Sequence, residues 1–340
     1  MTDDLYSEYD ESAISARPDL ETALDALAKY LDSNVPDATI IYGLSGLSRD
    51  QVDFSVQPVW AQVPVVQRRR IMRQLIEASE ANIELEYRSI GFLGLADPDP
   101  GVREAAIEVL WEDDSLELMT ALVQLALHDE AISVRAAATM GLSRFILKGE
   151  LGELPEQETR AAQNAAISLL TSEAEDVSVR RRALEAIANS SHDIVPSAIK
   201  AAYNSSDQLM RVSAVFAMGR SCDTIWEDIV LEELDSMDAE MRYEAARASG
   251  ELQIVEAVPK LAELALEDDR EILEAAVWSL GEIGSKEAVR ILDALAEKAE
   301  DEDDDELIQA IEEALGNASL VGDDLPDLWS IPFDDDEYDD

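Results

Sequence analysis

Side chains that commonly perform nucleophilic or acid–base chemistry are scarce in this chain of 340 residues. It contains two histidines, His128 and His192, and one cysteine, Cys222. The chain contains helical repeats, described below, and Cys222 and His192 occupy nearly equivalent turns of two adjacent repeats. Stacked helices lie about 8–10 Å apart, whereas a nucleophile–base pair needs about 3 Å. We therefore expect Cys222 to be a small packing residue. No catalytic residue, metal ligand or cofactor is predicted, and the chain is not expected to be an enzyme.

The acidic run 300–306 is the best candidate for a metal site. Asp301, Asp303 and Asp305 have the spacing that begins an EF-hand calcium loop, but Glu306 stands where that loop needs glycine. The repeat described below also places a helix there. A solvated acidic linker is therefore favoured over a calcium site.

Arginines and aromatic residues recur at regular offsets and are the strongest candidates for binding. Each repeat described below has a recurrent residue that we call its anchor. Positions one, five and nine residues after the anchor share one face of a helix. Arginine and aromatic side chains dominate protein-binding hot spots, although ordinary packing and ion pairing between helices is an alternative. The predicted partner-binding residues of this row are Met140, Arg144, Arg181, Phe216, Arg220, Tyr243, Arg247 and Trp278, with Val212 on the same row and Arg182 beside it.

A period of thirty-one residues positions this row. The anchors Arg180, Arg211, Arg242 and Leu273 are spaced by that period, with an Asp four residues before each and an Ala three residues after. Further copies are centred on Arg103, Arg135 and Ile308, which gives about seven units. Fixed periods of this length are typical of helical solenoids, in which each unit buries its apolar face against its neighbours.

Each unit is expected to be a helical hairpin. In one copy, Asp207 is placed to cap the second helix, and Pro196 is tolerated in the first turn of the first helix. Glycine eight residues after an anchor is expected to end the second helix or to thin its packing surface. The anchor arginines are expected to be structural and to pair with acids of their own or the neighbouring turn.

The units DDREILEAAVWSLGEIGSKEAVRIL and DPDPGVREAAIEVLW resemble HEAT repeats, particularly the short HEAT-like kind named after phycobilisome lyases. The resemblance covers about Leu85 to Gly316. It implies a protein-binding scaffold, since most members of such families are scaffolds, with a few enzymes and chaperone-like lyases among them.

Four regions are predicted along the chain. Residues 1–16 form a disordered acidic arm, 17–84 form capping helices, 85–316 form the repeat solenoid and 317–340 form a disordered acidic and aromatic tail. Within the capping region, Ser48 is placed to cap one helix and Pro64 to begin another. The spacing of the anchors widens between Arg135 and Arg180, which predicts an extended loop at about 145–159. A helix prolonged by a turn and followed by a long loop is favoured there, and a protruding binding loop is the alternative.

Charge narrows the range of partners. The chain has 75 acidic and 26 basic residues, a formal net charge of −49. Such a field repels nucleic acids and anionic membranes and attracts basic surfaces. Together with the single cysteine and the absence of an export signal or an apolar run of about 18 residues, it favours the cytoplasm. A salt-loving host and selection of a basic partner both remain explanations of the acidity.

The tail concentrates apolar residues inside acidic sequence. Its segment LPDLWSIPF includes Trp329 and Phe333, which are further candidates for partner binding. A short motif of this kind folds on a partner or docks on its own solenoid, whereas a purely solubilising tail is the simpler alternative.

Taken together, the sequence predicts an all-α, α-α superhelix that acts as a non-catalytic scaffold for a peptide or partner protein. The alternatives are a HEAT-like lyase or protein-modification accessory factor and an acidic assembly chaperone for a basic partner.

Overall fold

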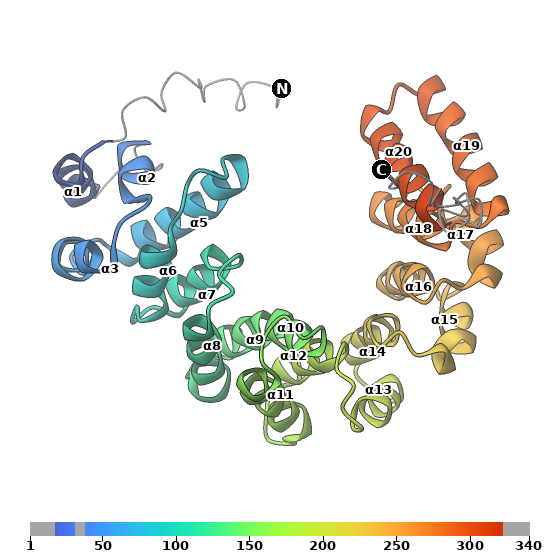
Figure 1. Cartoon of the computed structure of the whole chain (residues 1–340), viewed down its shortest axis with the longest axis horizontal. Helices are drawn as coiled ribbons and strands as arrows, with labels where there is room; N and C mark the ends of the chain where they lie inside the picture. The colour runs from blue at the N-terminus through green and yellow to red at the C-terminus, as the bar shows by residue number, and fades with distance from the viewer. Residues whose placement is uncertain (1–17, 31–37, 322–340) are drawn as a thin grey trace, which may run out of the picture. The chain divides into compact units, whose positions relative to one another are not determined.

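The computed structural model of the protein describes residues 18–30 and 38–321, and these residues form helices and no β-strand. The chain divides after Ile187 into two compact units, and each unit contains stacked helical hairpins (Figure 1). The predicted all-α superhelical fold is confirmed. Its division into two units, which falls within the predicted solenoid, was not foreseen. None of the described helices is both long and apolar enough to cross a membrane.

The first unit begins with short helices and continues as three hairpins. Its opening elements are α1 (Leu20–Lys29), α2 (Ala38–Leu44), α3 (Arg49–Gln51), the π-helix Val52–Val56, α4 (Gln57–Trp60) and α5 (Val65–Ala81). The hairpins are α6 (Arg88–Leu95) with α7 (Pro100–Val109), α8 (Leu116–His128) with α9 (Ile132–Gly141), and α11 (Glu156–Thr171) with α12 (Val177–Ile187). Ser48 caps α3 through a capping box, and Pro64 immediately precedes α5, as the sequence predicts.

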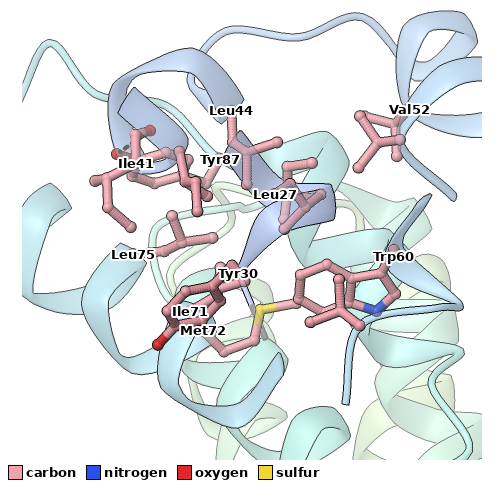
Figure 2. Packing of buried hydrophobic residues seen from close by; sticks show 14 of the residues in the cluster. Leu27, Tyr30, Ile41, Leu44, Val52, Trp60, Ile71, Met72, Leu75 and Tyr87 are labelled. Carbon is pink, nitrogen blue, oxygen red and sulfur yellow. Dashed lines mark hydrogen bonds between the residues drawn. The ribbon is translucent and has the colours of Figure 1, made fainter. Parts of the chain in front are cut away.

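A buried apolar cluster joins the opening helices of the first unit (Figure 2). Leu27, Leu44 and Ile71 come from α1, α2 and α5, and each is fully buried. Trp60 is also buried, and its indole N–H donates to the Asp97 carboxylate at 2.9 Å, so its polar atom is satisfied. This shared core holds together helices whose sequences follow the repeat poorly.

Two helices, α10 (Ser143–Glu150) and the start of α11, occupy most of the loop predicted at 145–159. Helix α10 buries Phe145 and Ile146, and α11 begins at Glu156 after a short connection. The glycines and proline in this stretch suggested a loop, but Gly149 is needed because a Cβ there would lie 2.2 Å from the Thr159 hydroxyl of α11. The insertion is therefore a packed helix rather than a protruding loop.

The second unit consists of four hairpins, each with a first and a second helix. They are α13 (Val195–Tyr203) with α14 (Gln208–Arg220), α15 (Glu227–Glu233) with α16 (Ala239–Glu251), α17 (Val258–Leu264) with α18 (Arg270–Ile283), and α19 (Lys286–Asp301) with α20 (Asp305–Val321). With the three of the first unit, the described residues form seven hairpins, in agreement with the predicted number.

Glycine brings the second helices of the second unit into close contact. A Cβ on Gly219 would lie 2.8 Å from the Cα of Ala248, and one on Gly250 would lie 2.8 Å from the Cα of Ser279. Both glycines lie inside their helices, so they thin the packing surface rather than ending the helix. The second helices α14, α16, α18 and α20 consequently pack side by side in sequence order (Figure 1).

The recurrent aspartates cap the second helices. The carboxylate of Asp207 accepts a hydrogen bond from the backbone N–H of Met210 at 2.9 Å, and Asp238 accepts one from Met241 at 3.0 Å. Asp99 and Asp269 cap α7 and α18 in the same way. A cap of this kind stabilises a helix by about 1 kcal/mol.

The predicted pairing of the anchor arginines with acids of a turn holds for three of the five, and the other two bind backbone carbonyls. Three of them form ion pairs with an acid of the next hairpin: Arg103 with Asp129 at 2.7 Å, Arg135 with Glu175 at 2.7 Å and Arg242 with Glu267 at 2.9 Å. Arg211 instead donates to the Ser205 carbonyl at 3.0 Å, and Arg180 to the Leu170 carbonyl at 3.2 Å. The anchors therefore hold the repeats together.

Candidate functional site

Five residues of the predicted arginine and aromatic row lie on consecutive second helices of the second unit. Phe216 and Arg220 belong to α14, Tyr243 and Arg247 to α16, and Trp278 to α18. All five side chains are half-buried, so each is held by packing and keeps an accessible surface. We call these five residues the unit-2 row.

Two arginines of the unit-2 row stack on aromatic rings. The guanidinium carbon of Arg247 lies 4.2 Å from the ring centroid of Trp278, and that of Arg220 lies 5.4 Å from the ring centroid of Phe216. Both distances allow cation–π attraction, which fixes the planes of ring and guanidinium against each other. The Arg247–Trp278 stack also links α16 to α18.

A buried carboxylate lies between these arginines. Glu251 Oε1 is 3.3 Å from Arg220 Nε and 3.8 Å from Arg247 Nη2. The carboxylate covers Gly219, where a Cβ would lie 2.6 Å from Oε2, so glycine makes room for it. Burial raises the pKa of Glu251, and the two nearby arginines oppose this shift without cancelling it.

The arrangement leaves two cations around one acid. The side chains of Arg220 and Arg247 are 39% and 31% exposed, whereas that of Glu251 is 13% exposed. A ligand that approaches this surface therefore meets guanidinium edges and ring faces before it meets the carboxylate. These groups can hydrogen-bond to a carboxylate and contact an apolar side chain.

Glu251 is not among the residues predicted from the sequence, although its position in the repeat carries a signal. Glu251 lies nine residues after the anchor Arg242, the position that Arg220 occupies relative to Arg211. A glutamate in a row that is otherwise rich in arginine indicates that the arginines form ion pairs within the protein.

The predicted residues of the first unit are engaged differently. Arg144 belongs to α10, because α9 ends at Gly141, and its guanidinium donates to the backbone carbonyls of Leu110, Trp111 and Asp113. It also lies 5.4 Å from the Trp111 ring centroid. Burial lowers the pKa of Arg144, and nearby Asp114 and Asp113 oppose the shift. This arginine therefore has a structural role as a clamp.

The remaining row residues of the first unit are Met140 on α9 and Arg181 and Arg182 on α12. All three are half-buried, and Arg182 donates to Glu185 at 2.5 Å. Their proposed role in partner binding stays a prediction. Trp329 and Phe333 lie outside the described residues.

Candidates for chemistry do not converge among the described residues. Cys222 is exposed in the turn after α14, which corrects its expected role as a packing residue, and His192 is also exposed. No group of three or more His, Cys, Asp or Glu residues within 18–30 and 38–321 could hold a metal ion. Asp304, within the acidic run 300–306, accepts a hydrogen bond from the backbone N–H of Leu307 and pairs with Arg270, so it caps α20.

Comparisons with known proteins point to one family. Residues 227–316 match a family model of HEAT repeats, and residues 93–110 and 114–138 match a model of HEAT repeats associated with sister chromatid cohesion. These segments correspond to hairpins in both units. No curated protein sequence matches the chain.

Solved structures similar to the chain include repeat proteins with distant sequences. YibA of Escherichia coli is 16% identical, with 84% of this chain and 98% of its own chain covered and a TM-score of 0.45. Importin beta is 16% identical over 88% of this chain and 41% of its own, with a TM-score of 0.42. Human deoxyhypusine hydroxylase is 18% identical over 88% and 96%, with a TM-score of 0.30. The seven described hairpins and these family matches identify HEAT repeats in both units of the chain.

Proposed function

We propose that this protein is a non-catalytic scaffold that binds a peptide or partner protein through the unit-2 row. The observation that carries the proposal is the stack of Arg247 on Trp278 beside Arg220 and Phe216. HEAT repeats form scaffolds suited to protein interaction, and arginine and aromatic anchors supply most of the energy at such interfaces.

The chemistry of the row favours a ligand with an apolar or aromatic side chain next to a carboxylate. Phe216 and Trp278 offer ring surface, while Arg220 and Arg247 share a single carboxylate and are each about one-third exposed. An incoming acid could accept a guanidinium hydrogen bond without displacing a backbone contact. In a chain of net charge −49, two partly exposed arginines on one surface reduce the repulsion that an acidic peptide meets there.

The proposal is tested by selecting peptides from a displayed random library on the immobilised full-length chain. Selection is run in parallel on the Trp278→Ala and Arg247→Ala variants, with Ala201→Glu as a control because Ala201 is exposed on the first helix α13. Peptides enriched on the wild type and on the control, but not on the row variants, support the proposal. Failure to enrich any peptide, or equal enrichment on all four proteins, contradicts it.

A second candidate, an assembly chaperone for a basic partner, is favoured by the acidic composition. Eighteen acidic residues and no basic residue lie within 299–340. Binding of a polylysine peptide that weakens steeply with salt, and is lost when residues 317–340 are replaced by a Gly/Ser sequence of equal length, would support this candidate. The arginine row predicts no such dependence on that segment.

A further inference from the structure

A second surface of the second unit is an apolar groove between the first helices α17 and α19. Its volume is about 380 Å³, and its apolar lining comes from Ala262, Leu266, Ile291, Ala294 and Leu295. Leu266, just after the end of α17, is 56% exposed. The groove is thus a surface that would bury apolar area if it were covered.

Unequal helix lengths create this groove. Helix α17 has seven residues and α19 has sixteen, so at about 1.5 Å per residue α19 is more than twice as long. The lining residues of α19 run from Glu287 to Lys298, over most of its length, whereas α17 and the turn after it contribute only Ala262 and Leu266 to the lining. Ile291 and Ala294 lie on the same side of α19 at helical spacing.

Two basic side chains border the groove. Arg290 is exposed, and the hydrogen bond recorded for it within the described residues goes to the Lys286 carbonyl of its own helix. Lys298 is exposed, and among residues 18–30 and 38–321 its ion-pair contact is a long one of 3.8 Å to Glu302. Glu287 is the one acid in the lining. In a strongly acidic chain, the groove combines apolar surface with cations that are available for pairing.

The occupant with matching chemistry is attached to the same unit. Nineteen residues, 322–340, follow α20, and they contain the apolar segment 325–333 (LPDLWSIPF) between acidic runs. The short connection between α19 and α20 makes them antiparallel, so the end of α20 lies near the start of α19 (Figure 1). Nineteen residues can span about 60 Å when extended, whereas α19 is about 24 Å long.

We propose that segment 325–333 of this chain docks in its own α17/α19 groove. Its apolar side chains cover Leu266 and Ala294, and the flanking acids pair with Arg290 and Lys298. The connection through α20 supplies an effective concentration of the order of millimolar, so even weak contacts hold the segment in place. This surface belongs to the first helices and is separate from the unit-2 row, so the inference does not depend on the proposed function.

The test measures the alkylation rate of a thiol placed at Ser330, which lies between Trp329 and Ile331. The full-length chain carries Cys222→Ser and Ser330→Cys, and a synthetic peptide of residues 322–340 with the same cysteine gives the unprotected rate. Docking predicts a rate at least about 5-fold slower in the protein than in the peptide. The rate should increase with added salt, because screening weakens the ion pairs.

Groove variants locate the protection. Ala294→Glu, or Arg290→Gln together with Lys298→Gln, should restore the rate of the free peptide, and Ala201→Glu should leave the protected rate unchanged. Circular dichroism of each variant establishes that its helices are retained. Protection removed by Trp278→Ala but not by Ala294→Glu would place the segment on the unit-2 row and overturn the proposal. Protection that grows with protein concentration would indicate docking on a second copy, and an unprotected rate in the wild type would exclude docking; either overturns the proposal as well.

Discussion

An arginine stacks on a tryptophan in each unit, and the two stacks differ in what else the arginine does. Arg144 lies over Trp111 in the first unit and donates to three backbone carbonyls, with a side chain that is 14% exposed. Arg247 lies over Trp278 in the second unit, makes a 3.8 Å contact to Glu251 and is 31% exposed. Arg144 donates its hydrogen bonds to the backbone of the first unit, whereas Arg247 keeps hydrogen-bonding capacity.

The comparison shows that cation–π geometry alone does not identify a binding surface. Both rings have an arginine at a favourable distance, so composition and spacing rank them equally. The occupancy of the guanidinium donors separates them. For this reason we propose partner binding for the unit-2 row and a structural role for Arg144.

The largest expected effect is the loss of the Arg144 clamp. Arg144→Ala should lower the free energy of unfolding by about 2–4 kcal/mol, because it leaves carbonyls of the first unit without their charged donor. Urea unfolding monitored by circular dichroism measures this change. A loss smaller than about 0.5 kcal/mol would show that the clamp is unimportant and would weaken the contrast with Arg247.

The next effect concerns binding. Trp278→Ala should reduce the affinity of peptides selected on the wild type at least 10-fold, a loss of about 1.4 kcal/mol, as expected for an aromatic anchor. Trp111→Ala is the matched control, since it removes the stacked ring of the first unit, and it should change affinity less than about 2-fold. Isothermal titration calorimetry measures both. Similar losses for the two variants would remove the distinction between the stacks.

A smaller effect should follow from Arg247→Lys. Lysine keeps the charge but loses the planar group that stacks on Trp278, so affinity for the same peptides should fall about 3-fold. Arg144→Lys should leave that affinity unchanged while lowering stability. If Arg247→Lys binds as well as the wild type, charge alone accounts for the role of Arg247.

The smallest expected effect is a change in pH dependence for Glu251→Gln. Burial holds the pKa of Glu251 above its ordinary value of 4.5 despite Arg220 and Arg247. A carboxyl with a raised pKa in the folded state favours folding most below its unfolded pKa, and this contribution is lost as pH rises through the folded pKa. Glutamine does not titrate, so the stability of the variant relative to the wild type should increase from about pH 4 to pH 7. A constant difference across that range would contradict the burial of the carboxylate.

Much of the fold follows from the sequence because the repeat fixes local structure. In most repeats an aspartate four residues before the anchor caps a helix, as Asp207 does, and a glycine eight residues after the anchor allows the next helix to approach where it is present, as at Gly219. These are local effects of side-chain chemistry on a helix of known period. The unit-2 row also follows from that period, since residues at equal offsets lie on neighbouring helices.

The features that could not be predicted from the sequence depend on contacts between segments that the repeat period does not relate to each other. Helix α10 forms because Phe145 and Ile146 find a buried site, although Gly149 and Gly152 suggest a loop. The α17/α19 groove depends on the shortness of α17, which the repeat pattern does not show. The pairing of Glu251 with two arginines requires the distance between α14 and α16.

The proposed function requires that the second helices of the second unit form the ligand surface. Its most direct test is photo-crosslinking of a selected peptide that carries a benzophenone group, followed by mass mapping of the adducts on the full-length chain. We predict adducts within α14, α16 and α18, between Gln208 and Ile283. Adducts confined to the first unit or to the first helices of the second unit would contradict the account.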